Sequence, residues 1–375
     1  MISGTHRPAQ IIIDRQAIKT NIQTAIAHLP AHTELWAVVK ANAYGHGLLQ
    51  VAATASHAGA TGFCVAILDE ALALRQAGFT EPILVLGITS PEYASLAATQ
   101  TISLTVGSQA WLTAALAQLA KAPAANPLKI HFAVDSGMGR IGFREPTALA
   151  MAEKMVRQHS QLELTGLYTH FATADEADSA YFKQQVHHFK QFKKALKTLP
   201  RYVHVANSAT SLWHQACAGN LVRLGVALYG LNPSGSDQAL PYPLQPALNL
   251  ETELVFVKQV TAGSKIGYGA TYQASQTEWI GTVPLGYADG WQRRLQGFHV
   301  LVAGQFCEIV GRICMDQFMI RLPQKFPVGT KVTLIGQNGG QTISLQDVAN
   351  FAKTIHYEIA CNFTDRLPRV YLPEN

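Results

Sequence analysis

The hydrophobic and polar positions of this chain follow two patterns, and the change falls near residue 244. Before it, short apolar runs alternate with stretches in which apolar residues recur every three to four positions, as in buried strands alternating with amphipathic helices. The predicted strands are Leu35–Val39, Gly62–Ala66, Ile83–Leu86, Ile102–Val106, Ile130–Val134, Leu164–Tyr168, Tyr202–Ala206 and Leu221–Leu224. The predicted helices are Asp14–Leu29, Gly47–Ala58, Asp69–Ala77, Pro91–Ala98, Ser108–Leu119, Pro146–Gln158, Ala180–Leu199 and Thr210–Ala216.

This alternation predicts an α/β fold with an N-terminal (β/α)8 barrel over residues 1–244. No G-x-G-x-x-G sequence follows an early strand, which argues against a dinucleotide-binding sheet. After a proline-rich hinge, helical periodicity nearly disappears, and we predict a mostly-β C-terminal domain over residues 245–375 with one helix near Ser344–Lys353. Its predicted strands include Glu253–Val260, Trp279–Val283, His299–Val302, Phe306–Val310 and Lys331–Ile335.

Composition narrows the class of protein. Hydrophobic residues make up 48% of the 375 positions and charged residues 14%, which is typical of a folded chain with large cores. The net charge of +5 is scattered, so we expect no nucleic acid and no membrane as partner. The five cysteines form no C-x-x-C pair, which argues against a disulfide framework and a metal site. With no apolar leader in Met1–Gln10, we expect a cytoplasmic protein.

The sequence around Lys40 carries the first sign of chemistry. The apolar run Leu35–Val39 predicts a buried strand, and Lys40 follows it directly. A partly desolvated amine at such a strand end can act as a base or form an imine. Tyr44 and His46, set among glycines, add groups that can bind an anion. A solvated lysine at a strand end is the plain alternative, but it explains none of these neighbours.

Other residues that could bind a ligand or take part in chemistry also lie at the ends of predicted strands, where a barrel places its functional loops. The loop Asp135–Phe143 carries Arg140, and the other strand ends carry His170, Asn207, Ser208, Arg223, Gly225 and Val226. The last two loops of a barrel are a usual phosphate site. Taken singly, Ser208 is more often a helix cap, His170 a core residue and Arg223 an ion-pair partner. Their joint position at one end of the barrel favours function.

A phosphate site together with an imine-forming lysine indicates pyridoxal 5′-phosphate as cofactor. Arg223 refines this hypothesis, because an arginine that is always charged would leave the pyridine nitrogen unprotonated. The negative charge left on the α-carbon when its proton is removed would then spread less into the ring. This favours rapid removal and return of a proton over transamination.

At these residues the chain resembles bacterial alanine racemases, which are fold type III pyridoxal-phosphate enzymes. The segment VKANAYGHG from Val39 to Gly47 is similar to the cofactor-attachment signature of that family. The resemblance extends over nearly the whole length, through Asp135–Gly142, His170–Asp175, Arg223–Gly225, Tyr268–Tyr272, Gly286–Gly290 and Gly311–Asp316.

The resemblance implies an interconversion of L- and D-alanine that supplies peptidoglycan synthesis. Lys40 would carry the cofactor and act as base on D-alanine, and Tyr268 from a second subunit would act on L-alanine in a homodimer. Implied cofactor contacts are Tyr44, Arg140, His170, Asn207, Ser208, Arg223, Gly225, Val226 and Tyr357. Arg140 and the Met315 amide would bind the substrate carboxylate, with Asp175, Tyr287 and Tyr357 at the entrance.

One departure and several alternatives remain open. Many family members have a carbamylated lysine where this chain has Ala133, so another group must orient Arg140. Without the resemblance, Tyr268 reads as an aromatic residue flanking a turn. The alternatives for function are a racemase for another small amino acid such as serine, a decarboxylase for basic amino acids, and a non-catalytic pyridoxal-phosphate-binding protein.

Overall fold

The structure is a computed structural model that describes residues 2–122, 124–214 and 219–374. It contains two compact units, which are treated separately below. The barrel unit consists of Ala17–Ala43 and Leu48–Pro246. The β unit consists of Met1–Gln16, Tyr44–Gly47 and Ala247–Asn375.

The barrel unit is built on parallel strands that nearly close into a ring. Within the described residues, eight strands follow the order β8-β7-β6-β5-β4-β3-β2-β9, and every neighbouring pair is parallel. The gap between β8 and β9 is spanned by a parallel bridge between Ala206 and Val222, where the Arg223 amide donates to the Ala206 carbonyl at 3.0 Å. The strands are β2 (Glu34–Val38), β3 (Gly62–Val65), β4 (Ile83–Val85), β5 (Ser103–Val106), β6 (Leu128–Ala133), β7 (Leu162–Tyr168), β8 (Tyr202–His204) and β9 (Leu221–Leu224).

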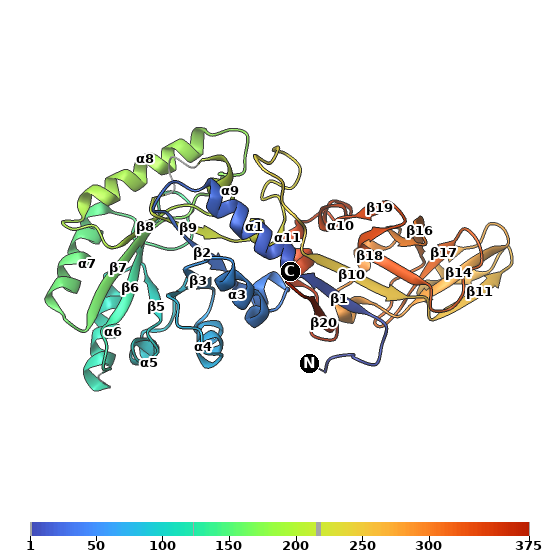
Figure 1. Cartoon of the computed structure of the whole chain (residues 1–375), viewed down its shortest axis with the longest axis horizontal. Helices are drawn as coiled ribbons and strands as arrows, with labels where there is room; N and C mark the ends of the chain where they lie inside the picture. Colours follow the sequence, from blue (N-terminus) through green and yellow to red (C-terminus); the bar gives the residue numbers. More distant parts are fainter. Residues whose placement is uncertain (1, 123, 215–218, 375) are drawn as a thin grey trace. The chain divides into compact units, whose positions relative to one another are not determined.

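Helices connect these strands, as the blue-to-green part of Figure 1 shows. They are α1 (Arg15–His28), α3 (Leu48–His57), α4 (Leu68–Gln76), α5 (Ala94–Thr99), α6 (Gln109–Lys121), α7 (Pro146–Gln158), α8 (Ala180–Ala195) and α9 (Ser208–Trp213). The predicted barrel is therefore confirmed, with element ends that differ by a few residues. The predicted helix Thr210–Ala216 begins two residues late, and its last two residues lie outside the described part of the chain.

The β unit is mostly β, as predicted. Its sheet is mostly antiparallel and follows the order β11-β14-β17-β16-β15-β18-β10-β1-β20 with β19 beside β18. Its strands are β10 (Leu248–Glu253), β11 (Phe256–Val260), β14 (Glu278–Val283), β15 (His299–Val302), β16 (Gln305–Val310), β17 (Phe318–Leu322), β18 (Lys331–Asn338), β19 (Gln341–Ile343) and β20 (Arg369–Leu372). A separate hairpin joins β12 (Lys265–Ile266) to β13 (Tyr272–Gln273). The helices are α10 (Leu345–Phe351), which was predicted, and α11 (His356–Cys361), which was not.

The N-terminal residues differ from the expected division of the chain. Strand β1 (Gln10–Asp14) pairs antiparallel with β10 and parallel with β20, so it belongs to the β unit and not to the barrel (Figure 1). Its apolar run is too short to reveal its partner strands. A domain boundary at residues 244/245 stays a prediction.

The single strand expected over Glu253–Val260 is wrong. The chain forms two strands there, because β10 pairs with β18 whereas β11 pairs with β14. Leu254 lies buried in the break between them, and its amide donates to the Thr330 carbonyl. Among the described helices, none has both the length and the apolar character that crossing a membrane requires.

A buried carboxylate joins distant parts of the β unit. Asp289 has no exposed surface and receives two hydrogen bonds from Arg7, at 2.6 and 3.0 Å. It also accepts from the Gly286 amide at 2.9 Å and forms an ion pair with Arg366 at 3.4 Å. The N-terminal segment is thereby attached to the loop that carries Tyr287.

We predict that Asp289→Asn destabilises the β unit by about 3 kcal/mol, because it leaves the Arg7 guanidinium without its buried partner. Urea unfolding followed by tryptophan fluorescence measures this loss. The matched control is Asp316→Asn, which breaks an exposed pair with Arg366 and should cost less than about 1 kcal/mol. Equal losses in the two variants would contradict the role of the buried carboxylate.

Candidate active site

Lys40 lies directly beyond β2, at the carboxyl end of the barrel strands. The residue before it still belongs to the sheet, since the Val39 amide donates to the Cys64 carbonyl at 2.9 Å. The residues after it form a left-handed turn, with φ between 52° and 54° at Ala41, Asn42 and Ala43. Each such residue other than glycine costs about 1–2 kcal/mol, so the surroundings must hold this turn in place.

Arg223, at the same end of the barrel, is a buried cation held by neutral acceptors. Its guanidinium donates to His204 Nδ1 at 2.5 Å and to the Thr169 carbonyl at 2.9 Å, and it lies over the Tyr168 ring at 5.2 Å. Burial lowers its pKa, but an arginine remains charged at neutral pH. Among the described residues, no carboxylate forms an ion pair with Arg223, so its positive charge is not cancelled locally.

A pair of buried histidines continues this hydrogen-bond chain. His204 accepts from Arg223 through Nδ1, so its proton belongs on Nε2, which lies 2.9 Å from His131 Nδ1. Burial, and next the charge of Arg223, lower the pKa of His131 to about 3 and that of His204 well below its usual value. Both side chains are therefore neutral at physiological pH.

Sequence reasoning missed His131 and His204. Both lie on inward-facing strand positions, where a histidine reads as part of the core. The one available signal was Gly166, which pairs with His131 across the sheet. A Cβ atom at that position would lie 2.2 Å from the His131 ring, so the glycine makes room for the histidine.

His170 joins this cluster from the end of β7. Its Nδ1 atom lies 3.4 Å from the Arg223 guanidinium. Desolvation lowers the pKa of His170 to about 3, and the charges of Arg223, Arg140 and Lys40 add to the effect. Lys40, Arg140 and Arg223 thus make the end of the barrel electropositive, which suits an anionic ligand.

The predicted phosphate loops also come together in the barrel unit. The Ser208 hydroxyl accepts from the amides of Gly225 at 2.9 Å and Ala227 at 3.3 Å, and it is nearly buried. Asn207 is the residue that caps α9, through a hydrogen bond from the Thr210 amide. The plain interpretation of Ser208 as the helix cap is therefore wrong. The bonds from the Gly225 and Ala227 amides fix the Ser208 hydroxyl beside the end of β9 and the start of Val226–Tyr229, and they leave its own proton to donate.

Two predicted residues of the barrel unit are less enclosed. Arg140 is exposed, and its guanidinium has no hydrogen-bond partner among the described residues. Its loop is shaped by Asp135, whose carboxylate accepts from the amides of Gly137 and Gly139. Ala133 is buried at the end of β6. Asp175 lies partly exposed between β7 and α8.

The remaining predicted residues lie in the β unit. Tyr268 stands on the β12–β13 turn with 72% of its surface exposed, and Met315 and Tyr287 are also exposed. The loops of the last two residues are joined, because the Ala288 amide donates to the Met315 carbonyl at 3.0 Å. Tyr44 and Tyr357 place their rings 6.0 Å apart.

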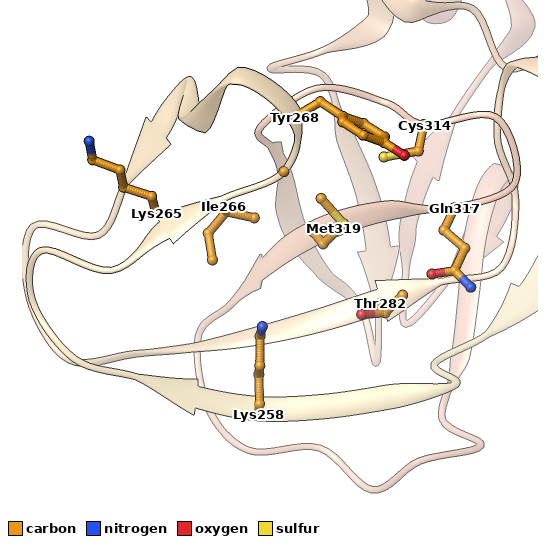
Figure 2. Close-up of a pocket in the computed structure, with 9 residues that line it drawn as sticks. Lys258, Lys265, Ile266, Tyr268, Thr282, Cys314, Gln317 and Met319 are labelled. Atoms are coloured by element: carbon orange, nitrogen blue, oxygen red, sulfur yellow. The ribbon is translucent and has the colours of Figure 1, made fainter.

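Tyr268 borders a shallow cavity of about 470 Å³ in the β unit. Figure 2 shows its ring reaching from the turn toward Cys314, with Met319 nearby. The lining residues are Lys258, Lys265, Ile266, Gly267, Tyr268, Thr282, Cys314, Gln317 and Met319. With 72% of its surface exposed, the Tyr268 side chain is accessible from outside this unit.

Known proteins match the chain along nearly its whole length. The alanine racemase N-terminal domain family matches residues 13–233, and the C-terminal domain family matches residues 247–371. An alanine racemase from Lactiplantibacillus plantarum is 63% identical over 99% of this chain and 100% of its own. The crystal structure of an alanine racemase from E. faecalis superposes with a TM-score of 0.97 at 53% identity, covering 99% of this chain and 100% of that one.

A related solved structure has a different name. The histidine racemase from Leuconostoc mesenteroides subsp. sake superposes with a TM-score of 0.93 at 37% identity, covering 99% of this chain and 100% of that one. The fold and the cationic barrel end define a two-domain barrel protein of the amino-acid racemase type. The chain belongs to the alanine racemase family, a family of isomerases.

We predict that acid destabilises the barrel through its buried histidines. Above about pH 6.5 the His131 side chain is neutral in both the folded and the unfolded chain. Between about pH 6.5 and pH 3, His131 takes up a proton in the unfolded chain but stays neutral in the folded one. The free energy of unfolding should therefore fall by up to about 1.4 kcal/mol per pH unit for this histidine, down to about pH 3. Urea unfolding at several pH values measures the slope.

His131→Gln removes the titrating group, so its stability should fall less steeply with acid than that of the parent. The matched control, His187→Gln, replaces an exposed histidine on α8 and should keep the parent slope. A parent slope in His131→Gln would show that another group causes the loss.

Proposed function

We propose that this protein interconverts L- and D-alanine with pyridoxal 5′-phosphate as cofactor. One observation carries the proposal within the fold: Lys40 stands at the same barrel end as Arg223, a buried cation held only by neutral acceptors among the described residues. The 63% identity to an alanine racemase supports the choice of alanine.

The donors at the barrel end fit the phosphate of such a cofactor. The nearly buried Ser208 oxygen accepts from the Gly225 and Ala227 amides, which leaves the hydroxyl proton of Ser208 to donate, and no described carboxylate pairs with Arg223 to oppose an anion there. Pyridoxal phosphate, when bound through a lysine amine, makes the α-hydrogen of an amino acid acidic. The residues proposed to hold it are Lys40, Tyr44, Arg140, His170, Asn207, Ser208, Arg223, Gly225, Val226 and Tyr357.

Arg223 would restrict the reaction to proton transfer. Its guanidinium stays charged at neutral pH, so it could donate a hydrogen bond to a pyridine nitrogen but would not transfer a proton to it. Negative charge would then remain near the α-carbon, where a base can return the proton quickly. The neutral state of His204 and His170 preserves this electrostatic effect, since neither histidine supplies an opposing charge.

Racemisation needs two bases on opposite faces of the substrate. We assign one to Lys40, acting on D-alanine, and the other to the partner subunit's Tyr268, acting on L-alanine. The 72% exposure of Tyr268 in one chain supports a role at another subunit. A homodimer with two shared sites follows, in which His170 would link Arg223 to the tyrosine and stabilise its phenolate.

Substrate binding completes the proposal. Arg140 and the Met315 amide would bind the carboxylate, and Asp175, Tyr287 and Tyr357 would line the entrance, where Tyr357 crowds all but a small side chain. A racemase for another small amino acid such as serine is the second candidate, since a similar structure is named for an amino acid other than alanine. Competition between alanine and serine for the purified protein distinguishes the two. A cytoplasmic location and a supply of D-alanine to peptidoglycan accompany the proposal.

For Lys40 we predict that Lys40→Ala lowers racemisation of alanine by at least about 100-fold, because it removes both the attachment point and one base. Polarimetry of purified protein measures the rate. Lys129→Ala, at the opposite end of strand β6 from the site, is the control and should keep the parent rate. Parent activity in Lys40→Ala would exclude this mechanism.

For Tyr268 we predict that Tyr268→Phe slows loss of the α-deuterium from L-alanine by about 100-fold or more, and from D-alanine by much less. Proton NMR of each deuterated enantiomer measures both rates. Tyr272→Phe, in the same hairpin and bonded to Glu278, serves as control. Equal slowing from both enantiomers would contradict the assignment of faces.

A further inference from the structure

The turn after Lys40 needs an external support. Ala41 and Ala43 have φ values of 54° and 53°, in the left-handed region, and neither is a glycine. Asn42 lies between them, and its side chain accepts from the Leu48 amide at 2.8 Å. Within the turn the Ala43 amide donates to the Val39 carbonyl at 2.8 Å, but neither alanine has a side-chain group that could add a further bond, so any further support comes from outside the turn.

Glu70, at the start of α4, supplies such a contact. Its Oε1 atom accepts from the Ala41 amide at 2.6 Å, across 29 residues of chain. Its Oε2 atom accepts from the amides of Ala66 at 2.8 Å and Ile67 at 3.3 Å. One carboxylate therefore connects the left-handed turn to the loop between β3 and α4.

Helix capping explains only half of these contacts. A glutamate at the third position of a helix commonly accepts from the capping residue, as Glu70 does from Ile67. That function uses one oxygen and leaves the other free for water. Here the second oxygen makes the shortest of the three bonds, to the residue that follows Lys40.

The backbone on both sides of Lys40 is thereby fixed to the same neighbour. Before it, the Val39 amide donates to the Cys64 carbonyl of β3. After it, the Ala41 amide donates to Glu70, which is itself bonded to the residues just beyond β3. A charge-assisted bond at this point opposes the strain of the turn.

We infer that Glu70 is a positioning residue: it holds the strained left-handed turn, and through it the backbone of Lys40, for reaction. The inference rests on the proposed function for its catalytic consequence. The structural part, a turn held by Glu70, stands independently of which amino acid the protein acts on.

The test compares Glu70→Ala with the parent in the full-length protein. Hydrogen–deuterium exchange followed by mass spectrometry should show the peptide around residues 39–44 exchanging at least about tenfold faster, since a charge-assisted bond is lost. The kcat for alanine should fall by a similar factor with little change in KM, because the base is misplaced while the carboxylate contacts remain. Asp69→Asn removes a charge from the same helical turn at an exposed position, and it should change neither quantity.

A second variant separates the turn from the cap of α4. Glycine adopts positive φ without strain, so Ala41→Gly added to Glu70→Ala should restore much of the slow exchange around residues 39–44 and part of kcat. It cannot repair the cap, so faster exchange at the start of α4 should persist. Parent-like exchange around residues 39–44 in Glu70→Ala, or a double variant no better than Glu70→Ala, would overturn the inference. If the parent itself fails to racemise alanine, the proposed function fails while the exchange experiment still decides the role of Glu70.

Discussion

The burial of one cation organises the end of the barrel. Arg223 is 3% exposed, and removing a guanidinium from water costs several kcal/mol unless its donors are satisfied. Neutral groups from neighbouring strands satisfy them: the His204 ring, the Thr169 carbonyl and, at longer range, the His170 ring. This arrangement requires the barrel to be nearly closed, since β9 must lie beside the end of β8.

The choice of hydrogen-bond acceptor decides whether the barrel end keeps its positive charge. A carboxylate would stabilise the buried arginine more simply, but it would cancel that charge, whereas neutral acceptors leave it in place. His131 and His204 stay uncharged because burial disfavours their protonated forms, and the positive charge of Arg223 reinforces this. The same electrostatics therefore keep the histidines neutral and the site attractive to an anion.

The candidate active site also contains a strained backbone turn and a side chain that stabilises it. The turn after Lys40 adopts backbone angles that its alanines disfavour, and Glu70 provides the bond that opposes this preference. Strained residues concentrate at functional sites because a relaxed loop would sample many positions. In the β unit, the buried Asp289 has a comparable function, since it joins the N-terminal segment to the loop beside Met315.

The local sequence pattern determined the elements of the barrel and the positions of its candidate functional residues. Short apolar runs and helical periodicity predicted every strand of the barrel, because each of these elements buries one face or one stripe. The residues at the strand ends could be picked out in the same way, because parallel strands of a barrel present their ends together, and the structure brings His170 to Arg223 and Ser208 to Gly225. Tertiary structure alone decided that β1 joins the β unit, that His131 and His204 support Arg223, and that Glu70 reaches Ala41. These features depend on contacts between residues far apart in the chain, and neither periodicity nor spacing records which distant groups become neighbours.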